Sequence, residues 1–319
     1  MIALVFPGQG SQAVGMGREL VERFPEAAET LRAADEALDF PLSKVCLEGP
    51  EDELRRTENT QPALLAVSIA AHRVLGARVL YTPALGAGHS LGEYSALVAA
   101  GALPFADALR AVRARGSFMQ AAVPERIGAM AAVLGLSAEL VAQACAEAAQ
   151  GEVVAPANIN GADQTVISGH AGAVERAGAA CKALGAKRVL ALPVSAPFHC
   201  ALMEPARKRM VHVLERIPFV EPRYPVVSNV LARPVTEPGQ IKALLLEQIV
   251  APVRWYESVQ MMVAAGVTTF VELGAGKVLS GLLRRAAKDV TVLNVEDGAS
   301  LDVALTKLGT LGLSSKEPR

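Results

Sequence analysis

Aromatic residues are scarce in this sequence: Phe, Trp and Tyr together make up 4% of its 319 residues, with a single tryptophan. Hydrophobic residues nevertheless reach 51%, and charged residues 20%. This balance excludes a disordered chain and predicts a globular protein whose core is built mostly from Ala, Val and Leu. The length suits one large domain, or one domain with an insert.

Cysteine is also rare, and the four cysteines are far apart with no Cys-x-x-Cys spacing (Cys46, Cys145, Cys181 and Cys200). This spacing argues against a disulfide framework and against a zinc site. We therefore predict no metal centre, and a reducing, cytoplasmic location.

Charge of one sign is not in excess, because the formal net charge is −1. A neutral balance argues against broad nucleic-acid binding. No stretch of about 18 apolar residues is free of Gly, Pro or charge, so no transmembrane helix is expected. Residues 2–6 are typical of a first strand rather than of a signal peptide. Neither a nucleic acid nor a membrane is an expected partner.

The most informative segment present is Gly88-His89-Ser90-Leu91-Gly92, which reads Gly-x-Ser-x-Gly. Apolar residues 84–87 precede it and a helix-like run, 91–100, follows it. Strand, sharp turn and helix in that order describe a nucleophile elbow, in which small neighbours let the serine Oγ project. The pentapeptide alone also occurs in ordinary turns.

A nucleophilic Ser90 needs a base, and His199 is the best of the five histidines. It follows a loop with two prolines, a rigid setting that suits a base. The same sequence pattern would also fit a histidine that only packs against its neighbours. His89 adjoins the serine, so a structural role is expected for it. No triad acid is evident, because Glu93 is too near the serine and Glu204 is one turn past the histidine. A Ser-His dyad oriented by a carbonyl therefore stays open.

Three further polar residues are candidates for substrate binding because of where they lie in the sequence. Arg115 lies in the expected helix 105–122, where its guanidinium could match a carboxylate or simply face solvent. Gln9 lies in a glycine-rich loop after the first strand and could place a backbone N–H beside an oxyanion. Asn160, like Asn158, precedes Gly161-Ala162-Asp163, and turn chemistry alone could explain both.

The order of the expected elements changes in the middle of the chain. Strands and helices alternate as β-α-β-β-α-β over 130–192, which is the split βαβ motif. We therefore predict an inserted subdomain at 126–194 within a larger α/β domain formed by 1–125 and 195–310. Residues 311–319 are expected to form a polar tail.

Taken together, these motifs closely resemble the malonyl-CoA:acyl-carrier-protein transacylases of fatty acid synthesis. The resemblance covers roughly residues 3–295, and its motifs occur in the family's order. They are Phe6-Pro7-Gly8-Gln9-Gly10-Ser11-Gln12, Thr60-Gln61-Pro62-Ala63-Leu64, Gly88 to Leu97, Arg115-Gly116-x-Phe118-Met119-Gln120, Asn158-x-Asn160, Pro193 to His199, Gln248, Pro252-Val253-x-Trp255, and Glu272-x-Gly274-x-Gly276-Lys277-Val278-Leu279.

The resemblance implies an α/β-hydrolase-like large domain with a parallel sheet and an inserted ferredoxin-like subdomain. It implies ping-pong transfer of malonyl from coenzyme A to the phosphopantetheine thiol of acyl carrier protein, with no permanently bound cofactor and a monomeric enzyme. The implied roles are a nucleophile (Ser90), its base (His199), a residue that orients the base through its main-chain carbonyl (Gln248), two oxyanion N–H donors (Gln9 and Leu91), a malonyl carboxylate clamp (Arg115), a pocket neighbour (Asn160) and a residue that narrows the pocket (Phe198).

Two departures from the family pattern and three rival functions stay open. Ala275 stands where proline is frequent, and Phe198 occupies a variable position that bears on acyl choice. The rivals are a serine thioesterase, a malonyltransferase for malonate decarboxylase or polyketide synthesis, and an inactive docking module. Five cations could form a carrier-docking patch or ordinary surface: Lys187, Arg188, Lys277, Arg284 and Arg285.

Overall fold

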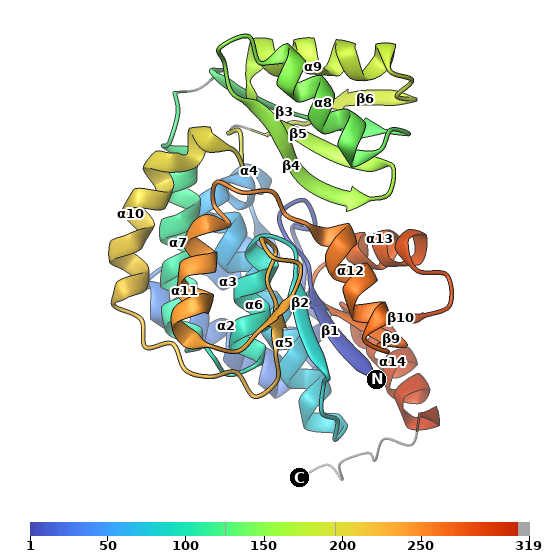
Figure 1. Cartoon of the computed structure of the whole chain (residues 1–319). Helices are drawn as coiled ribbons and strands as arrows, with labels where there is room; N and C mark the ends of the chain where they lie inside the picture. The colour runs from blue at the N-terminus through green and yellow to red at the C-terminus, as the bar shows by residue number, and fades with distance from the viewer. Residues whose placement is uncertain (125, 195, 312–319) are drawn as a thin grey trace.

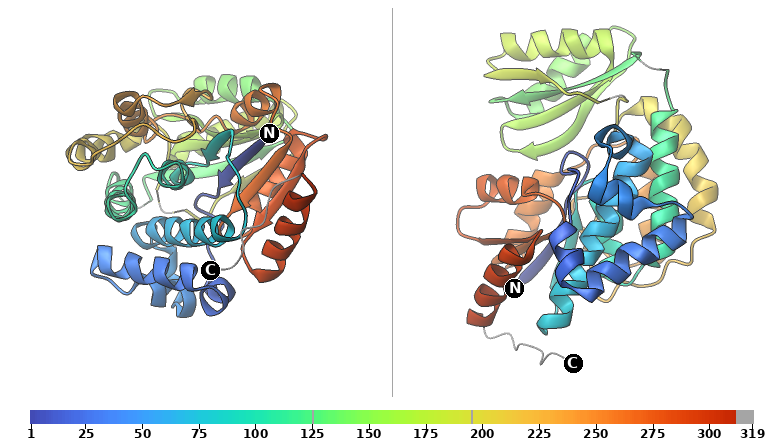
Figure 2. Two further views of the ribbon diagram at one scale, coloured as in Figure 1. Left: turned by 90° about the horizontal axis from the view of Figure 1, so that it is seen from below. Right: turned by 180° about the vertical axis from the view of Figure 1, so that it is seen from behind.

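The computed structural model describes residues 1–124, 126–194 and 196–311. Glu125 and Ser195, which stand at the two predicted domain boundaries, lie outside the described residues, as do residues 312–319 of the predicted tail. Figure 1 shows a large body and, above it, a smaller unit of strands and helices from the middle of the chain. The right-hand view in Figure 2 shows the same division from behind.

The large body is built on a six-stranded sheet in the order β10-β9-β1-β2-β7-β8. All neighbouring strands pair in parallel except β7 and β8. A mixed α/β fold with a largely parallel sheet is therefore confirmed. The strands are β1 (Ile2–Phe6), β2 (Leu85–Gly88), β7 (Val226–Val227), β8 (Pro234–Val235), β9 (Thr269–Leu273) and β10 (Thr291–Val295).

Both faces of this sheet are buried, as the alternation of side chains along β1 shows. Leu4 and Phe6 pack into a core with the helices that follow the first two strands, whereas Ala3 and Val5 pack against the helices near the C-terminus. The helices are α1 (Arg18–Arg23), α2 (Pro25–Leu38), α3 (Leu42–Glu48), α4 (Glu51–Arg55), α5 (Thr57–Arg78), α6 (Leu91–Ala99), α7 (Phe105–Gln120), the 3₁₀ turn η1 (Ala201–Met203), α10 (Glu204–Glu215), α11 (Pro238–Glu247), α12 (Trp255–Ala264), α13 (Val278–Ala286) and α14 (Gly298–Thr310).

The smaller unit is a separate antiparallel sheet in the order β4-β5-β3-β6. Ala131 and Val133 on one face pack with two helices in a core of their own. Met130 and Val166 belong to the core of the large body instead, so the other face lies toward the large body. The elements are β3 (Gly128–Leu134), α8 (Ala138–Ala148), β4 (Val154–Gly161), β5 (Gln164–His170), α9 (Ala171–Ala183) and β6 (Arg188–Ala191).

Several expected elements differ from the structure. Asn158 and Asn160 lie in strand β4 rather than in a turn, because β4 continues to Gly161 and pairs with β5 through two register shifts. Helix α14 was not expected at all, although Asp297 and Ser300 form a capping box at its start.

Strands β1 and β2 end side by side at one edge of the parallel sheet, where their last residues, Phe6 and Gly88, pair. That edge is where ligands bind in open α/β sheets.

Candidate active site

Ser90 occupies a sharp turn between β2 and α6. Its backbone has φ 51° and ψ −107°, in the left-handed range that a non-glycine residue rarely adopts. The flanking glycines are required by space: a Cβ on Gly92 would lie 2.1 Å from the carbonyl oxygen of Phe6. A Cβ on Gly88 would lie 1.9 Å from the carbonyl carbon of Gly92. The sequence thus folds here as the expected elbow, with the Ser90 Oγ at the start of a helix.

His199 lies at hydrogen-bond distance from this serine although 109 residues separate them in sequence. The Ser90 Oγ and His199 Nε2 are 2.7 Å apart. The His199 Nδ1 lies 2.8 Å from the main-chain carbonyl oxygen of Gln248. Because a carbonyl can only accept, Nδ1 carries the proton and Nε2 is left to accept one from the serine. No carboxylate is needed to orient the ring, and the geometry favours the dyad over a triad.

The charge state of His199 follows from its surroundings. The side chain is 4% exposed. Burial, and then the charge of Arg115, lower the pKa of His199 to about 3, while its hydrogen bond to the Gln248 carbonyl works in the opposite direction. A neutral imidazole is the form that can accept the serine proton.

Arg115 projects from α7 into the same site and is 1% exposed. Its Nη2 lies 3.1 Å from the Ser90 Oγ and 2.8 Å from the Gln248 Oε1, and its Nη1 lies 2.9 Å from the Gln61 Oε1. The Nε has no partner in the described part of the chain. All of these acceptors are neutral, so a buried guanidinium faces the nucleophile without a carboxylate bonded to it.

Close approach of two helices puts Arg115 there. The next residue, Gly116, packs so tightly that a Cβ on it would lie 2.5 Å from the carbonyl oxygen of Thr57, at the start of α5. Helix α5 also carries Gln61, the acceptor for Nη1. The small residue therefore allows α5 and α7 to bring an amide and a guanidinium together.

A second layer of contacts holds the backbone of Ser90. The Ser90 N–H donates to the Asn229 Oδ1 at 2.7 Å, and the Ser90 carbonyl accepts from the Gln248 Nε2 at 3.0 Å. The Glu93 Oε2 accepts from both holders, at 2.7 Å from the Gln248 Nε2 and 3.2 Å from the Asn229 backbone nitrogen. The sequence alone assigns no role to Gln61 or Asn229, and it places Glu93 too near the serine to act as a triad acid. The contacts of all three with the site depend on the fold.

His89 and Asn160 join the elbow to the small sheet. The His89 Nε2 lies 2.8 Å from the Asn160 Oδ1, so β4 reaches the residue next to the nucleophile. The ring centroids of His89 and Trp255 are 5.9 Å apart. Burial lowers the pKa of His89, and its hydrogen bond to Asn160 opposes that effect. His89 therefore bridges two parts of the fold, and Asn160 is brought to the edge of the site.

The other predicted site residues lie along the same edge. Leu91 is buried and begins α6, so its N–H is among those that a helix start leaves without an intrahelical partner. Gln9 is exposed and follows Gly8, on which a Cβ would lie 2.4 Å from the His89 carbonyl oxygen. Phe198 is 9% exposed and directly precedes the histidine.

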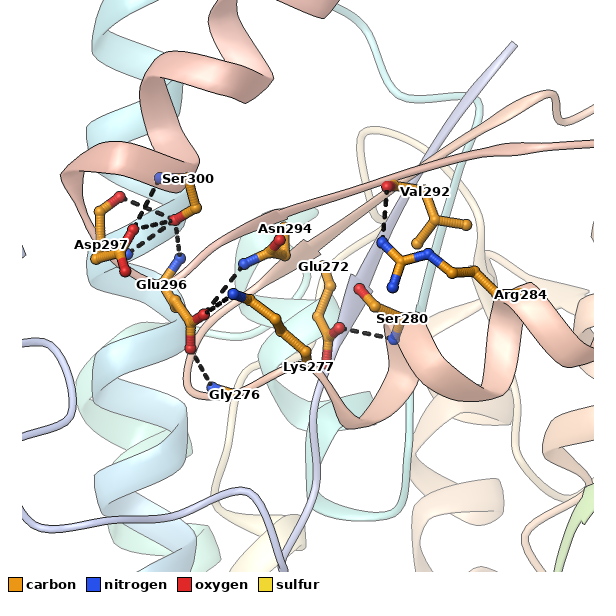
Figure 3. Close-up of polar contacts among 10 residues, drawn as sticks. All are labelled: Glu272, Gly276, Lys277, Ser280, Arg284, Val292, Asn294, Glu296, Asp297 and Ser300. Atoms are coloured by element: carbon orange, nitrogen blue, oxygen red, sulfur yellow. Dashed lines mark hydrogen bonds and ion pairs between the residues drawn. The ribbon is translucent and has the colours of Figure 1, made fainter.

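The five predicted cations differ in their bonding. Figure 3 shows the Lys277 ammonium paired with Glu296, at 2.8 Å, and the Arg284 guanidinium directed at the Val292 carbonyl oxygen, at 3.4 Å. Arg285 donates to the Gln164 side chain at 3.2 Å. No ion pair in the described part of the chain uses Lys187 or Arg188. Of the five, Lys277 is the one whose charge is already neutralised.

Neither a cluster of metal-binding side chains nor a membrane-spanning helix occurs among the described residues. No group of three or more His, Cys, Asp or Glu side chains there could hold a metal ion. None of the helices within the described ranges is long and apolar enough to cross a bilayer.

Comparison with known proteins places the chain. The model of the acyl transferase domain family matches residues 3–306. The malonyl CoA-acyl carrier protein transacylase of Salmonella typhimurium is 50% identical over 305 residues, covering 96% of this chain and 99% of the relative. The protein of the same description from Bacillus subtilis is 47% identical over 308 residues, covering 96% and 97%.

Solved structures give the same answer. An acyl carrier protein S-malonyltransferase from Vibrio cholerae superposes with a TM-score of 0.92 at 50% identity, covering 95% of this chain and 99% of that one. A malonyl-transacylase in complex with its type II PKS acyl-carrier protein superposes with a TM-score of 0.94 at 48% identity, covering 96% and 99%. The chain belongs to the malonyl CoA-acyl carrier protein transacylases, a family of acyltransferases built on the acyl transferase domain.

Proposed function

We propose that this chain transfers malonyl from coenzyme A to the phosphopantetheine thiol of acyl carrier protein through a malonyl ester on Ser90. The observation that carries this proposal is the position of the Ser90 Oγ, 2.7 Å from a neutral imidazole and 3.1 Å from a buried guanidinium. The first group can activate the hydroxyl, and the second can hold the free carboxylate of the acyl group.

Acylation begins with the His199 Nε2 accepting the Ser90 proton while Oγ attacks the thioester carbonyl. The tetrahedral oxyanion is stabilised by the backbone N–H groups of Leu91 and Gln9, at the positive end of α6. Collapse breaks the C–S bond, and the departing thiolate of coenzyme A takes the proton from His199. The carrier thiol then repeats the same steps in reverse, which returns Ser90 to its free form.

Arg115 explains why malonyl is preferred over acetyl. The malonyl carboxylate takes the place of the neutral amide and hydroxyl oxygens as the hydrogen-bond acceptor for the guanidinium. Because the carboxylate is charged, the resulting hydrogen bond is stronger. An acetyl group offers no such partner, so the guanidinium keeps only its neutral acceptors. Asn160 and Phe198 border this pocket, and the Phe198 ring would narrow it against a branched acyl group.

The finer features of the fold and setting belong to the same proposal. The large body, 1–125 with 195–310, is α/β-hydrolase-like, since its serine elbow lies at the carboxyl edge of a parallel sheet. The subdomain 126–194 is ferredoxin-like, since its elements follow the order β-α-β-β-α-β. We further propose a monomer without a resident cofactor, and a cytoplasmic location that agrees with four free cysteines.

A comparison of acceptors tests this function against the thioesterase rival. The malonyl-enzyme, isolated after exposure to malonyl-CoA, is mixed with holo acyl carrier protein or with buffer alone. Transfer to the carrier thiol much faster than release of free malonate supports a transacylase. Equal rates would identify a hydrolase. Carriers of fatty acid synthesis and of polyketide synthesis, compared side by side, separate the remaining pathway alternatives.

A further inference from the structure

Glu93 is a buried carboxylate that the proposed chemistry does not use. It lies three residues after the nucleophile on α6 and is 3% exposed. A carboxylate in such a place costs free energy unless it is hydrogen-bonded and its charge is compensated. Because Glu93 lies directly behind the residues that contact Ser90, a functional role would account for the free-energy cost of burying its charge.

Two hydrogen bonds hold this carboxylate, and both come from residues that contact the nucleophile. The Gln248 Nε2 and the Asn229 backbone N–H both donate to the Glu93 Oε2. The Asn229 side chain accepts from the Ser90 N–H, and the Gln248 side chain donates to the Ser90 carbonyl. Glu93 is therefore fixed in place behind the serine, and it does not touch the reacting hydroxyl.

The Gln248 amide stands between Glu93 and the guanidinium. Its Oε1 accepts from the Arg115 Nη2 at 2.8 Å, while its Nε2 donates to Glu93 at 2.7 Å. No ion pair within the described residues joins Arg115 to an acidic group. The negative charge is thus close enough to act on Arg115 through space, and it does not occupy the hydrogen-bonding positions of the guanidinium.

This arrangement determines how strongly the pocket holds an anion. With Glu93 ionised, the buried charges of Arg115 and Glu93 cancel, and a bound malonyl carboxylate adds a net negative charge. With a neutral residue at 93, the same carboxylate would meet an uncompensated cation. In a buried site, where charges are poorly screened, that difference changes the stability of the malonyl-enzyme.

We propose that Glu93 is a positioning residue that weakens the grip of Arg115 on the malonyl carboxylate, so that the malonyl-enzyme stays close in free energy to its thioester partners. This inference rests on the proposed function. The step concerned is Ser90–OH + malonyl-S-CoA ⇌ Ser90–O-malonyl + HS-CoA, in which the ester C–O bond forms, the C–S bond breaks and the serine proton ends on sulfur. A transacylase must run this step in both directions, and an over-stabilised ester would be a trap.

The equilibrium constant of that step, measured separately for malonyl-CoA and acetyl-CoA, tests the proposal. Purified enzyme is equilibrated with fixed ratios of acyl-CoA and coenzyme A, and the fraction acylated is read from the intact mass. For Glu93→Gln, the malonyl constant should rise about threefold to tenfold while the acetyl constant stays unchanged. A merely structural role would move both constants together, or neither.

Two further variants sharpen the test. Glu93→Asp keeps the charge, so the ratio of the malonyl to the acetyl constant should stay at the wild-type value even if the protein is less stable. Glu272→Gln is a matched control, because Glu272 is also fully buried but caps the start of α13 by accepting from the backbone nitrogens of Leu279 and Ser280. Figure 3 shows the bond to Ser280. The ratio should not move in that variant.

A pH series on the wild-type enzyme supplies an answer even if Glu93→Gln does not fold. Burial raises the pKa of Glu93 to about 7, against the hydrogen bonds from Gln248 and Asn229 and the charge of Arg115. The neighbouring groups do not titrate between pH 6 and 8: Arg115 stays charged, the pKa of Tyr94 is raised to about 12, and that of His199 is lowered to about 3. Burial also holds the pKa of His89 below its usual value.

Lowering the pH from 8 to 6 protonates Glu93 and should therefore raise the malonyl constant relative to the acetyl constant. Ionisation of the coenzyme A thiol affects both constants equally and cancels in their ratio. A ratio that stays flat with pH and in Glu93→Gln overturns the inference about Glu93 alone. Failure of the wild-type enzyme to form any malonyl ester would instead overturn the proposed function.

Discussion

Arg115 Nη2 and Ser90 Oγ lie 3.1 Å apart, so the only cation bonded to the nucleophile among the described residues comes from a helix that begins 15 residues after it. No acidic side chain among the described residues is hydrogen-bonded to this guanidinium, and its closeness to Ser90 suits it to hold the far end of a short acyl chain on the serine. We therefore propose that selection of the acyl group and activation of the hydroxyl take place within one contact network.

Removal of the guanidinium should change which acyl group is transferred. In Arg115→Ala, malonyl transfer should fall by about a hundredfold, because the carboxylate loses its only charged partner. Acetyl transfer should be spared or improved, since an acetyl group makes no charged hydrogen bond to the guanidinium. The measurement is kcat/KM for malonyl-CoA and acetyl-CoA. Arg113→Ala is the control, because Arg113 lies on the same helix but stacks on Phe40; equal losses for both donors in Arg115→Ala would make that residue merely structural.

The pH dependence of acylation should lack an acid limb near neutrality. The pKa of His199 is lowered to about 3, so its neutral form dominates at every pH well above that value. The rate at which an uncharged serine-directed reagent labels Ser90 should therefore stay flat between pH 8 and 5 and fall only nearer pH 3. An inflection near 6.5, the usual value for histidine, would contradict the desolvated base.

The space around two glycines, one at the elbow and one in α13, predicts opposite effects of replacing them by alanine. In Gly92→Ala, the new Cβ would overlap the Phe6 carbonyl oxygen, which should lower the free energy of unfolding by about 1–3 kcal/mol and impair acylation. In Gly281→Ala, within α13, a Cβ meets nothing within 4 Å, so stability should rise by about 0.5–1 kcal/mol. Denaturant unfolding measures both changes, and a stable, active Gly92→Ala enzyme would be inconsistent with the tight turn.

Carrier recognition should depend on exposed cations that have no acidic partner among the described residues. Arg188 is exposed on β6 and forms no ion pair in the part of the chain described. Arg188→Glu should raise KM for the acidic carrier protein several-fold, with the largest effect at low salt. Transfer to free pantetheine, an uncharged acceptor, should not change. If both acceptors respond alike, Arg188 does not act through carrier docking.

The sequence predicted those parts of the molecule that depend on neighbouring residues. The elbow could be predicted from five consecutive residues, because a tight turn at Ser90 leaves no room for a Cβ on the flanking glycines. The alternation along β1 likewise follows from burial on both faces of the sheet. Helix α14 also has a local signal, because Asp297 and Ser300 form a capping box at its start, but this helix is not among those predicted.

The other contacts of the candidate active site could not be predicted from the sequence, because they join residues that are far apart along the chain. Asn229 reaches Ser90 across 139 residues and Gln61 reaches Arg115 across 54. Asn229 has no neighbours that mark it as functional, and the motif that contains Gln61 does not predict its contact with Arg115. Glu93 was dismissed because it is too close to the serine to act as a triad acid. Its actual contacts, with Gln248 and the Asn229 backbone, depend on the fold. Asn160 seemed to belong to a turn because two register shifts in β4 obscure the strand pattern.

The most direct test of the account is the intact mass of the protein after exposure to malonyl-CoA, followed by peptide mapping. The account predicts one malonyl group per chain, carried by the peptide that contains Ser90, and removed on addition of the carrier thiol. Ser90→Ala should show no added mass. A malonyl group elsewhere in the chain, or one that forms in Ser90→Ala, would contradict the assignment of Ser90 as the nucleophile.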